Sequence, residues 1–217
     1  MPNAAVIFDL DGVLTDTAEL HFQSWLLLAR ELSIPFDRAA NEALRGLSRP
    51  DSLTLFLGPP AERFTPAERD GIMARKNAAY LERVARLGPQ DLLPGAGELL
   101  ESLRQAGVPT AVASSSRNAR HVLARLGIER FVDVIVDGND VPASKPDPRV
   151  FLAAAERLNV PAKRCVVVED AESGVAGALA AGMRVVGLGP YERVGAADVV
   201  VASLVELAAA DLLNLLT

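Results

Sequence analysis

The 217-residue sequence predicts a doubly wound, Rossmann-like α/β fold: a parallel sheet with helices on both faces, carrying an inserted all-helical cap. Two observations lead to this fold class. In the second half of the chain, short valine-rich runs alternate with helical patterns, and strands buried on both faces have such continuous apolar runs. After the first apolar run, by contrast, about eighty residues carry no strand signal.

Six apolar runs are predicted as strands, and helical patterns lie between and after the later ones. Gly107, Gly127, Asn159 and Gly182 stand one or two residues after four of these patterns, where a residue of left-handed conformation commonly ends a helix. The expected strands are 4–8, 108–113, 132–136, 164–168, 185–188 and 198–201, and the expected helices are 95–105, 117–126, 148–158, 171–181 and one from about 204.

The interval after the first strand is too long for a connecting loop and therefore needs a fold of its own. Asp16 is predicted to cap its first helix, and Thr65 with Glu68 forms a capping box that opens a long helix to about residue 86. Shorter helices are expected at 38–44 and 49–57.

These helices predict a cap domain of residues 16–88 inserted into an α/β core domain of residues 1–15 and 89–217. Two linkers, 12–16 and 88–94, would join the domains. Because both linkers lie at one edge of the core, we expect them to act as a hinge.

Composition narrows the possible partners. The net charge is −6, and no Lys/Arg stripe is present that could bind a nucleic-acid backbone. Cys165 is the only cysteine and lies in an apolar run, which favours a buried thiol and a reducing compartment. The N-terminus lacks a signal-peptide pattern, and the apolar stretch 199–216 contains Glu206 and Asp211. We therefore expect a cytoplasmic protein that binds neither nucleic acid nor membrane. A monomer is our expectation as well, although no feature of the sequence decides the oligomeric state.

Polar residues follow the first four predicted strands, where the carboxyl ends of parallel strands form the usual ligand-binding edge. Asp9 and Asp11 are two apart in an extended segment, so their side chains point the same way, and Asp170 would reach the same centre. Converging carboxylates need a counter-charge, and their oxygen-only ligand set suits Mg²⁺ better than zinc. The residues at the four ends are Asp9 and Asp11; Ser114, Ser115, Ser116, Arg117 and Asn118; Lys145; and Glu169 and Asp170.

The serine-rich loop 114–118 precedes a predicted helix, so it offers hydroxyls and backbone amides to an anion such as a phosphate. The same residues could serve only as turn and cap residues, but both uses employ the same amides. Lys145 adds a fixed positive charge. A magnesium ion, a carboxylate nucleophile, a lysine and a phosphate-binding loop together indicate phosphoryl transfer.

Four motifs, in order along the α/β part, resemble those of the haloacid dehalogenase superfamily. Several cap segments resemble the β-phosphoglucomutase family within it, although Arg45 stands where that family often has lysine. The four motifs are Phe8-Asp9-Leu10-Asp11-Gly12, Ser114, Lys145-Pro146 and Glu169-Asp170-x-x-x-Gly174, and the cap segments are 16–25, 45–52 and 75–77.

The resemblance implies a division of roles among the acids. Asp9 would become an aspartyl phosphate, and Asp11 would be the general acid and base. Lys145 and Ser114 would contact the transferring phosphate. Mg²⁺ would be held by Asp9, Asp11, Glu169 and Asp170, although Glu169 could instead act through water or accept amides at a helix terminus.

Arg49 separates a mutase from a phosphatase, because a mutase must hold the second phosphate of its substrate while the first reacts. The alternative for Arg49 is a helix start. The resemblance also implies that His21 and Lys76 reach Asp11 when the cap closes, although His21 could be a core histidine one turn before Trp25. The implied substrate-binding residues are Trp25, Gly46, Leu47, Ser48, Arg49, Ser52, Ser114, Ser115, Ser116, Arg117 and Asn118.

The activity that this resemblance implies is the interconversion of β-D-glucose 1-phosphate and glucose 6-phosphate through β-D-glucose 1,6-bisphosphate. Sugar phosphates would be the partners. Two alternatives stay open: a sugar-phosphate phosphatase of the same fold, and a non-catalytic module that binds phosphosugars.

Overall fold

Six parallel strands form the centre of the computed structural model, which describes residues 4–59, 64–141 and 143–216. Their order is β3-β2-β1-β4-β5-β6, so the direction of winding reverses between β1 and β4. The predicted doubly wound fold is confirmed. The strands are β1 (Ala5–Phe8), β2 (Thr110–Ala113), β3 (Val134–Val136), β4 (Cys165–Glu169), β5 (Arg184–Leu188) and β6 (Val199–Val201).

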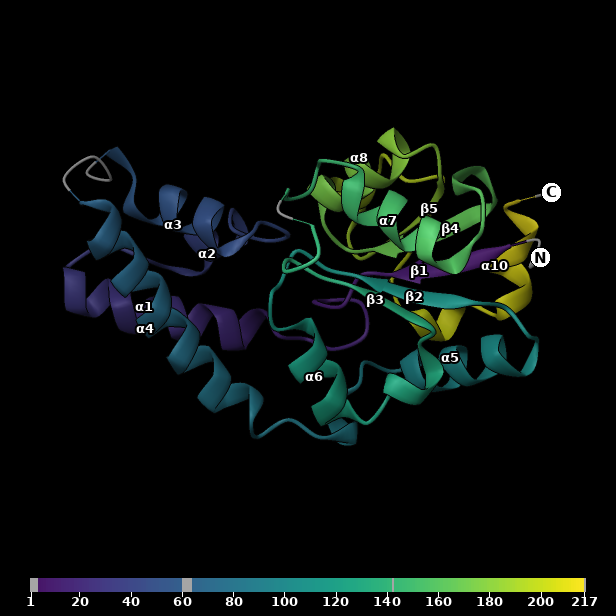
Figure 1. Cartoon of the computed structure of the whole chain (residues 1–217), viewed down its shortest axis with the longest axis horizontal. Coiled ribbons are helices and arrows are strands. Elements are labelled where there is room, and N and C mark those ends of the chain that lie inside the picture. Colours follow the sequence, from purple (N-terminus) through teal and green to yellow (C-terminus); the bar gives the residue numbers. More distant parts are fainter. Residues whose placement is uncertain (1–3, 60–63, 142, 217) are drawn as a thin grey trace.

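Helices cover both faces of the sheet (Figure 1). Val6 and Phe8 of β1 belong to one apolar core, and Ala5 and Ile7 belong to the other, as the two-residue period of a strand requires. Cys165 is buried in the second core. The first core is covered by α5 (Ala96–Gln105), α6 (Ala119–Leu126) and α10 (Ala209–Asn214), and the second by α7 (Arg149–Leu158) and α8 (Glu172–Ala180).

All six predicted strands are present, but their ends differ by one or two residues. The second starts at Thr110 instead of residue 108, because Pro109 has no N–H to donate to a ladder, although its carbonyl accepts from Val6. The four predicted left-handed positions are confirmed, with φ angles of 68°, 70°, 56° and 72° at Gly107, Gly127, Asn159 and Gly182.

The predicted continuous helix from about residue 204 is wrong. The chain forms a 3₁₀ turn, η5 (Leu204–Glu206), then runs extended before α10 begins at Ala209. The reason is a new helix start: the carboxylate of Asp211 accepts the Ala208 N–H at 2.8 Å. The prediction also missed α9 (Tyr191–Val194) and three further 3₁₀ turns, η2 (Pro89–Asp91), η3 (Glu129–Phe131) and η4 (Ala162–Arg164).

Residues from Ala18 to Val84 add helices at one end of the sheet, on the left of Figure 1. They have an apolar core of their own, in which the rings of Trp25 and Phe56 lie 4.8 Å apart. The predicted capping box is present, since Thr65 and Glu68 each accept the other's N–H. The helices are α1 (Ala18–Leu32), α2 (Arg38–Glu42), α3 (Arg49–Leu57) and α4 (Pro66–Val84).

Asp16 is not the N-cap residue that the sequence predicts. Thr17 holds that position, while the Asp16 carboxylate accepts the N–H of Ala18 at 3.0 Å from one residue further out. The hydroxyl of Thr17 makes no capping hydrogen bond and donates to Asp11 instead. Among the described residues, no helix is long and apolar enough to span a bilayer.

The two connections between these helices and the sheet lie side by side. Thr15 bridges to Leu92, and its hydroxyl donates to the Asp91 carbonyl at 2.7 Å. The Leu93 N–H donates to the Leu14 carbonyl at 2.9 Å. Gly12 has a φ of 90°, which allows the first connection to turn back on itself. The position of the helices relative to the sheet therefore depends on two adjacent short segments.

Candidate active site

Three buried carboxylates meet where the winding of the sheet reverses. Asp9 follows β1, Glu169 ends β4 and Asp170 comes next; one oxygen from each lies within 4.8 Å of the others. A cluster of carboxylate oxygens alone is the donor set that divalent hard cations prefer, so these residues fit a divalent cation. Gly174 makes room for the cluster, because a Cβ there would lie 1.8 Å from Oε1 of Glu169.

Lys145 compensates two of the three charges. Its Nζ donates to Oδ1 of Asp9 and, at 2.6 Å, to Oε1 of Glu169. Burial by itself lowers the pKa of Lys145, but the two carboxylates outweigh it and raise the pKa above its ordinary value. Lys145 is therefore buried and charged rather than solvated. The peptide bond to Pro146 is cis.

Asp11 lies beside this cluster with different partners. Its carboxylate accepts from the hydroxyl of Thr17 and lies 3.5 Å from that of Ser114. Burial, followed by repulsion from Asp9, raises its pKa to about 6, against opposing effects of Thr17 and Lys145. A carboxyl with this pKa can give and take a proton near neutral pH. Its role as a metal ligand stays a prediction, since the cluster contains only the other three carboxylates among the described residues.

The serine-rich loop uses part of its polar capacity on itself. The Ser116 N–H donates to Oγ of Ser114 at 3.0 Å, and the Asn118 N–H donates to Oγ of Ser116 at 3.2 Å. These bonds delay the start of α6 to Ala119, two residues after the predicted start. The amide of Asn118 donates to Oδ1 of Asn77 at 2.8 Å and so links this loop to α4.

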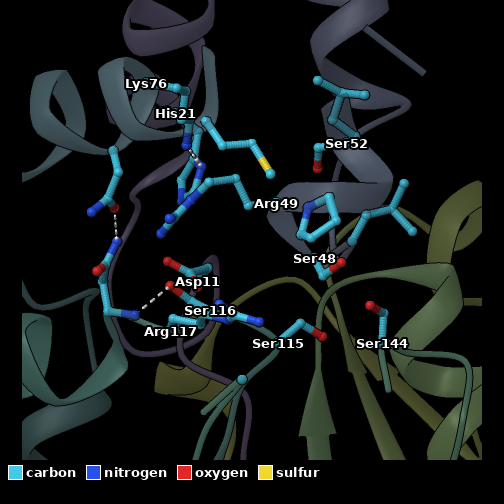
Figure 2. Close-up of a pocket in the computed structure, with 18 of the residues that line it drawn as sticks. Asp11, His21, Ser48, Arg49, Ser52, Lys76, Ser115, Ser116, Arg117 and Ser144 are labelled. Carbon is cyan, nitrogen blue, oxygen red and sulfur yellow. Dashed lines mark hydrogen bonds between the residues drawn. The ribbon is translucent and has the colours of Figure 1, made fainter. Parts of the chain in front are cut away.

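A cleft of about 660 Å³ lies between the sheet edge and helices α1 to α4. His21, Arg49 and Lys76 face Asp11, Ser116 and Arg117 across it (Figure 2). Of the predicted site residues, four do not line the cleft: Ser114, Lys145, Glu169 and Asp170, all of which are buried. Those that do are Asp9, Asp11, His21, Trp25, Gly46, Leu47, Ser48, Arg49, Ser52, Lys76, Ser115, Ser116, Arg117 and Asn118.

Lys76 is an almost fully buried lysine on the cap side. Its Nζ lies 2.8 Å from Nδ1 of His21, 5.2 Å from the centre of the Trp25 ring and 4.8 Å from that of Tyr80. Burial, and then the charge of Arg49, lowers the pKa of Lys76 to about 7. Burial also holds the pKa of His21 well below its ordinary value, so this histidine is neutral at pH 7. His21 lines the cleft and also packs on Tyr80, so its predicted approach to Asp11 stays a prediction.

Arg49 and Arg117 approach the cleft from opposite sides. Burial, followed by repulsion from Arg117, lowers the pKa of Arg49. Among the residues that the structure describes, no carboxylate forms an ion pair with either guanidinium. Two neighbouring positive charges without an acidic partner are suited to an anion supplied by a ligand.

The loop before α3 packs closely on the core. Gly46 has a φ of 75°, and a Cβ there would lie 2.6 Å from Oγ of Ser173 in α8. The carboxylate of Asp51 accepts from the hydroxyl of Ser48 at 2.6 Å and from that of Ser144, beside Lys145, at 2.5 Å. The predicted substrate loop is therefore held against the sheet domain by polar contacts.

A family model for haloacid dehalogenase-like hydrolases matches residues 4–182. The chain belongs to this family. The superfamily that its four motifs predict is thus confirmed, and those motifs supply Asp9, Lys145, Glu169 and Asp170 around one centre.

Individual relatives of this haloacid dehalogenase-like protein include both mutases and phosphatases. It is 46% identical to the β-phosphoglucomutase of Bacillus subtilis, over 91% of this chain and 88% of that one. It is 33% identical to a phosphorylated carbohydrates phosphatase of Thermotoga maritima, over 82% of each chain. The crystal structure of a β-phosphoglucomutase from Clostridium difficile has a TM-score of 0.95 and 36% identity, covering 100% of this chain and 97% of that one.

Among the contacts of this haloacid dehalogenase-like site that sequence reasoning missed are Thr17 on Asp11, Tyr80 over Lys76, and Arg45 on Asp170. Tyr80 is four residues after Lys76 on one helix face, so that contact had a signal in the spacing. The other two had none, because they depend on how the linker turns and where the cap loop lies.

Proposed function

We propose that this protein is a magnesium-dependent β-phosphoglucomutase that interconverts β-D-glucose 1-phosphate and glucose 6-phosphate through β-D-glucose 1,6-bisphosphate. The observation that carries the proposal is the presence of two cationic stations around one cleft, one buried behind Asp9 and one on the lining of the cleft. Lys145 stands beside Asp9 at the buried station, and Arg49 with Arg117 forms the second. A bisphosphate needs both stations, and two of the relatives described above are β-phosphoglucomutases.

In the proposed reaction Asp9 carries the phosphoryl group as an aspartyl phosphate. Asp11 takes the proton from the sugar hydroxyl that attacks phosphorus, and the bond from phosphorus to Asp9 breaks. The bisphosphate then turns end for end in the cleft. Asp9 attacks the other phosphate, and Asp11 returns the proton to the sugar oxygen that leaves. The pKa of Asp11, about 6, supports both directions of this proton transfer.

Magnesium is the cation that we propose for the carboxylate cluster, with Asp9, Glu169 and Asp170 as the side chains that would hold it. When bound, it would neutralise charge on the transferring phosphoryl group. Before any cation binds, the positive charge of Lys145 offsets the repulsion between two of these carboxylates, Asp9 and Glu169. Ser114 and the loop after it would hold the phosphate oxygens through hydroxyls and amides.

We propose that residues 16–88 act as a cap domain that closes over the cleft and excludes water. Water must be excluded because it would hydrolyse the aspartyl phosphate and turn the mutase into a phosphatase. His21 and Lys76 would then lie over Asp11, and the loop from Gly46 to Arg49, with Ser52 and Trp25, would contact the sugar phosphate. A cytoplasmic, monomeric enzyme remains our expectation.

The decisive experiment is a turnover assay with β-glucose 1-phosphate, Mg²⁺ and a bisphosphate primer. Glucose 6-phosphate and free phosphate are both measured. We expect glucose 6-phosphate to exceed free phosphate by a large factor, and a dominant release of free phosphate would instead identify a phosphatase. The second outcome has support in the relative from Thermotoga maritima.

The variant Asp9→Asn is the matched control for this assay. It keeps the size of the side chain and removes the nucleophile, so turnover falls by about three orders of magnitude or more while sugar-phosphate binding persists. If the wild-type protein binds sugar phosphates with no turnover of any kind, the protein is a binding module and the proposal is wrong.

A further inference from the structure

The cap contacts the carboxylate cluster directly through Arg45. Its Nη1 donates to Oδ2 of Asp170, a residue 125 positions away in the sequence. The Arg45 side chain is 22% exposed, whereas that of Asp170 is only 3% exposed. The guanidinium of Arg45, in the loop before α3, therefore pairs with one of the three carboxylates of the proposed cation site.

Arg45 belongs to a small network on Asp170. Oε1 of Glu42 accepts from Nε of Arg45 at 2.9 Å and from Nη1 of Arg193 at 3.1 Å. Arg193 in turn donates to the main-chain oxygen of Asp170 at 2.6 Å, not to its carboxylate. A cavity of about 250 Å³ borders Arg45, Asp170 and Arg193, so the network has room to rearrange. Arg45 and Arg193 thus touch the same residue in two different ways.

The basic side chains in this region compete with a divalent cation for the carboxylates. Lys145 pairs with Asp9 and Glu169, and Arg45 pairs with Asp170, so three carboxylates and two basic groups leave one net negative charge. A dication would bring this group to one net positive charge if Arg45 stayed, and to zero if Arg45 moved away. Like charges a few ångströms apart repel in a partly buried site. Arg45 therefore disfavours cation binding in both cases. If Arg45 stays, its charge repels the cation, and if Arg45 moves away, its ion pair with Asp170 is lost.

We propose that Arg45 competes with the divalent cation for the carboxylate of Asp170, so that cation binding and the contact between this cap loop and the core weaken each other. The inference rests on the proposed cation site. Arg45 is then a positioning residue: it holds Asp170 when no cation is bound and releases it on binding. Because coupling is reciprocal, the cation must also loosen the loop around Arg45.

The test is the affinity of the full-length protein for Mg²⁺ alone, measured by calorimetry without substrate. Removing the charge in Arg45→Met tightens binding by about threefold to tenfold. The matched control Arg193→Met removes a guanidinium that contacts Asp170 only at its main-chain oxygen and also pairs with Glu42. It tightens Mg²⁺ binding clearly less than Arg45→Met does, because its charge does not pair with the Asp170 carboxylate. Arg45→Lys keeps a positive charge and stays closer to the wild type than Arg45→Met. Circular dichroism checks that each variant is folded.

A second readout follows the loop itself. Amide hydrogen exchange of residues 43–47 speeds up when Mg²⁺ is added to the wild type, and does not respond to Mg²⁺ in Arg45→Met. Unchanged or weaker Mg²⁺ binding in Arg45→Met, or equal tightening in Arg193→Met, overturns the competition while leaving the proposed function intact. If the wild type binds no Mg²⁺ at all, the cation site itself is wrong, and this inference falls with it.

Discussion

The two cationic stations, Lys145 behind the cleft and Arg49 with Arg117 on its lining, differ in how their charges are balanced. Lys145 is buried and donates to two carboxylates, so the positive charge of the first station is balanced by side chains of the protein. Arg49 and Arg117 repel each other and have no acidic partner among the described residues, so their balance must come from a ligand. One station is assembled before the substrate arrives, and the other is completed by it. This difference predicts that the loss of Lys145 lowers stability, whereas the loss of Arg49 lowers activity and leaves stability nearly unchanged.

The largest expected effect is on the stability of Lys145→Met. Removing this side chain leaves Asp9 and Glu169 buried without a partner, which costs about 3–5 kcal/mol of unfolding free energy. Urea denaturation in the presence of a chelator measures it. In the matched variant Arg49→Met no ion pair is lost, and we expect a change below about 0.5 kcal/mol. Equal losses in the two variants would contradict the comparison.

The next effect is on catalysis at the arginine station. In Arg49→Met the distal phosphate loses a charge-assisted hydrogen bond, which lowers kcat/KM for β-glucose 1-phosphate by about thirtyfold, or about 2 kcal/mol. Arg117→Met has a smaller effect, because this side chain is exposed to solvent. Steady-state assays that separate glucose 6-phosphate from free phosphate measure both. A variant with unchanged kcat/KM would remove Arg49 from the phosphate site.

A third prediction concerns the pH dependence of stability at Asp11. Its pKa rises from 3.8 to about 6 on folding, so the ionised carboxyl destabilises the fold above pH 6, and that loss is recovered as pH falls toward 4. Because the side chain is only half-buried and lines the cleft, we expect only about 1–2 kcal/mol. Asp11→Asn is therefore more stable than the wild type at pH 8, and the difference shrinks by pH 5. Denaturation of both proteins at the two pH values would expose a pH-independent difference if the assignment were wrong.

The smallest effect is expected at the contact between Asn77 and Asn118. Asn77→Ala removes one hydrogen bond between α4 and the serine-rich loop, worth about 0.5–1.5 kcal/mol. Because that bond helps to hold the cap helix over the cleft, the KM for the sugar phosphate rises by about twofold to fivefold. Progress curves at several substrate concentrations measure the change. The reference variant Thr65→Ala loses a helix cap far along the same helix and leaves KM unaltered.

The strands and the acidic cluster could be predicted because their signals are local. Each strand is a short apolar run, and the polar residues at four strand ends stand in the segment that follows each run. Parallel topology then brings Asp9, Lys145, Glu169 and Asp170 together without further information. The error in the last helix has a local cause as well, since the side chain of Asp211 starts a new helix at Ala209.

The environments of the cap side chains could not be predicted in the same way. Nothing near Lys76 in the sequence indicates that the ring of Trp25, more than fifty positions earlier, covers its ammonium group and that His21 lies against it. The prediction that Asp16 caps α1 was wrong for a similar reason, because the position of Thr17 depends on its contact with Asp11 across a linker turn.

The sequence by itself determined the doubly wound sheet, the helical insertion and the chemical groups at the carboxyl edge, because periodicity and residue type are properties of short segments. Only the tertiary structure decided which cap residues meet which core residues. Arg45 pairs with Asp170, and Arg49 approaches Arg117, because Thr15 and Leu92 set the two linkers side by side and so fix the cap over the edge. Contacts between residues far apart in the chain depend on that placement, and no local pattern encodes it.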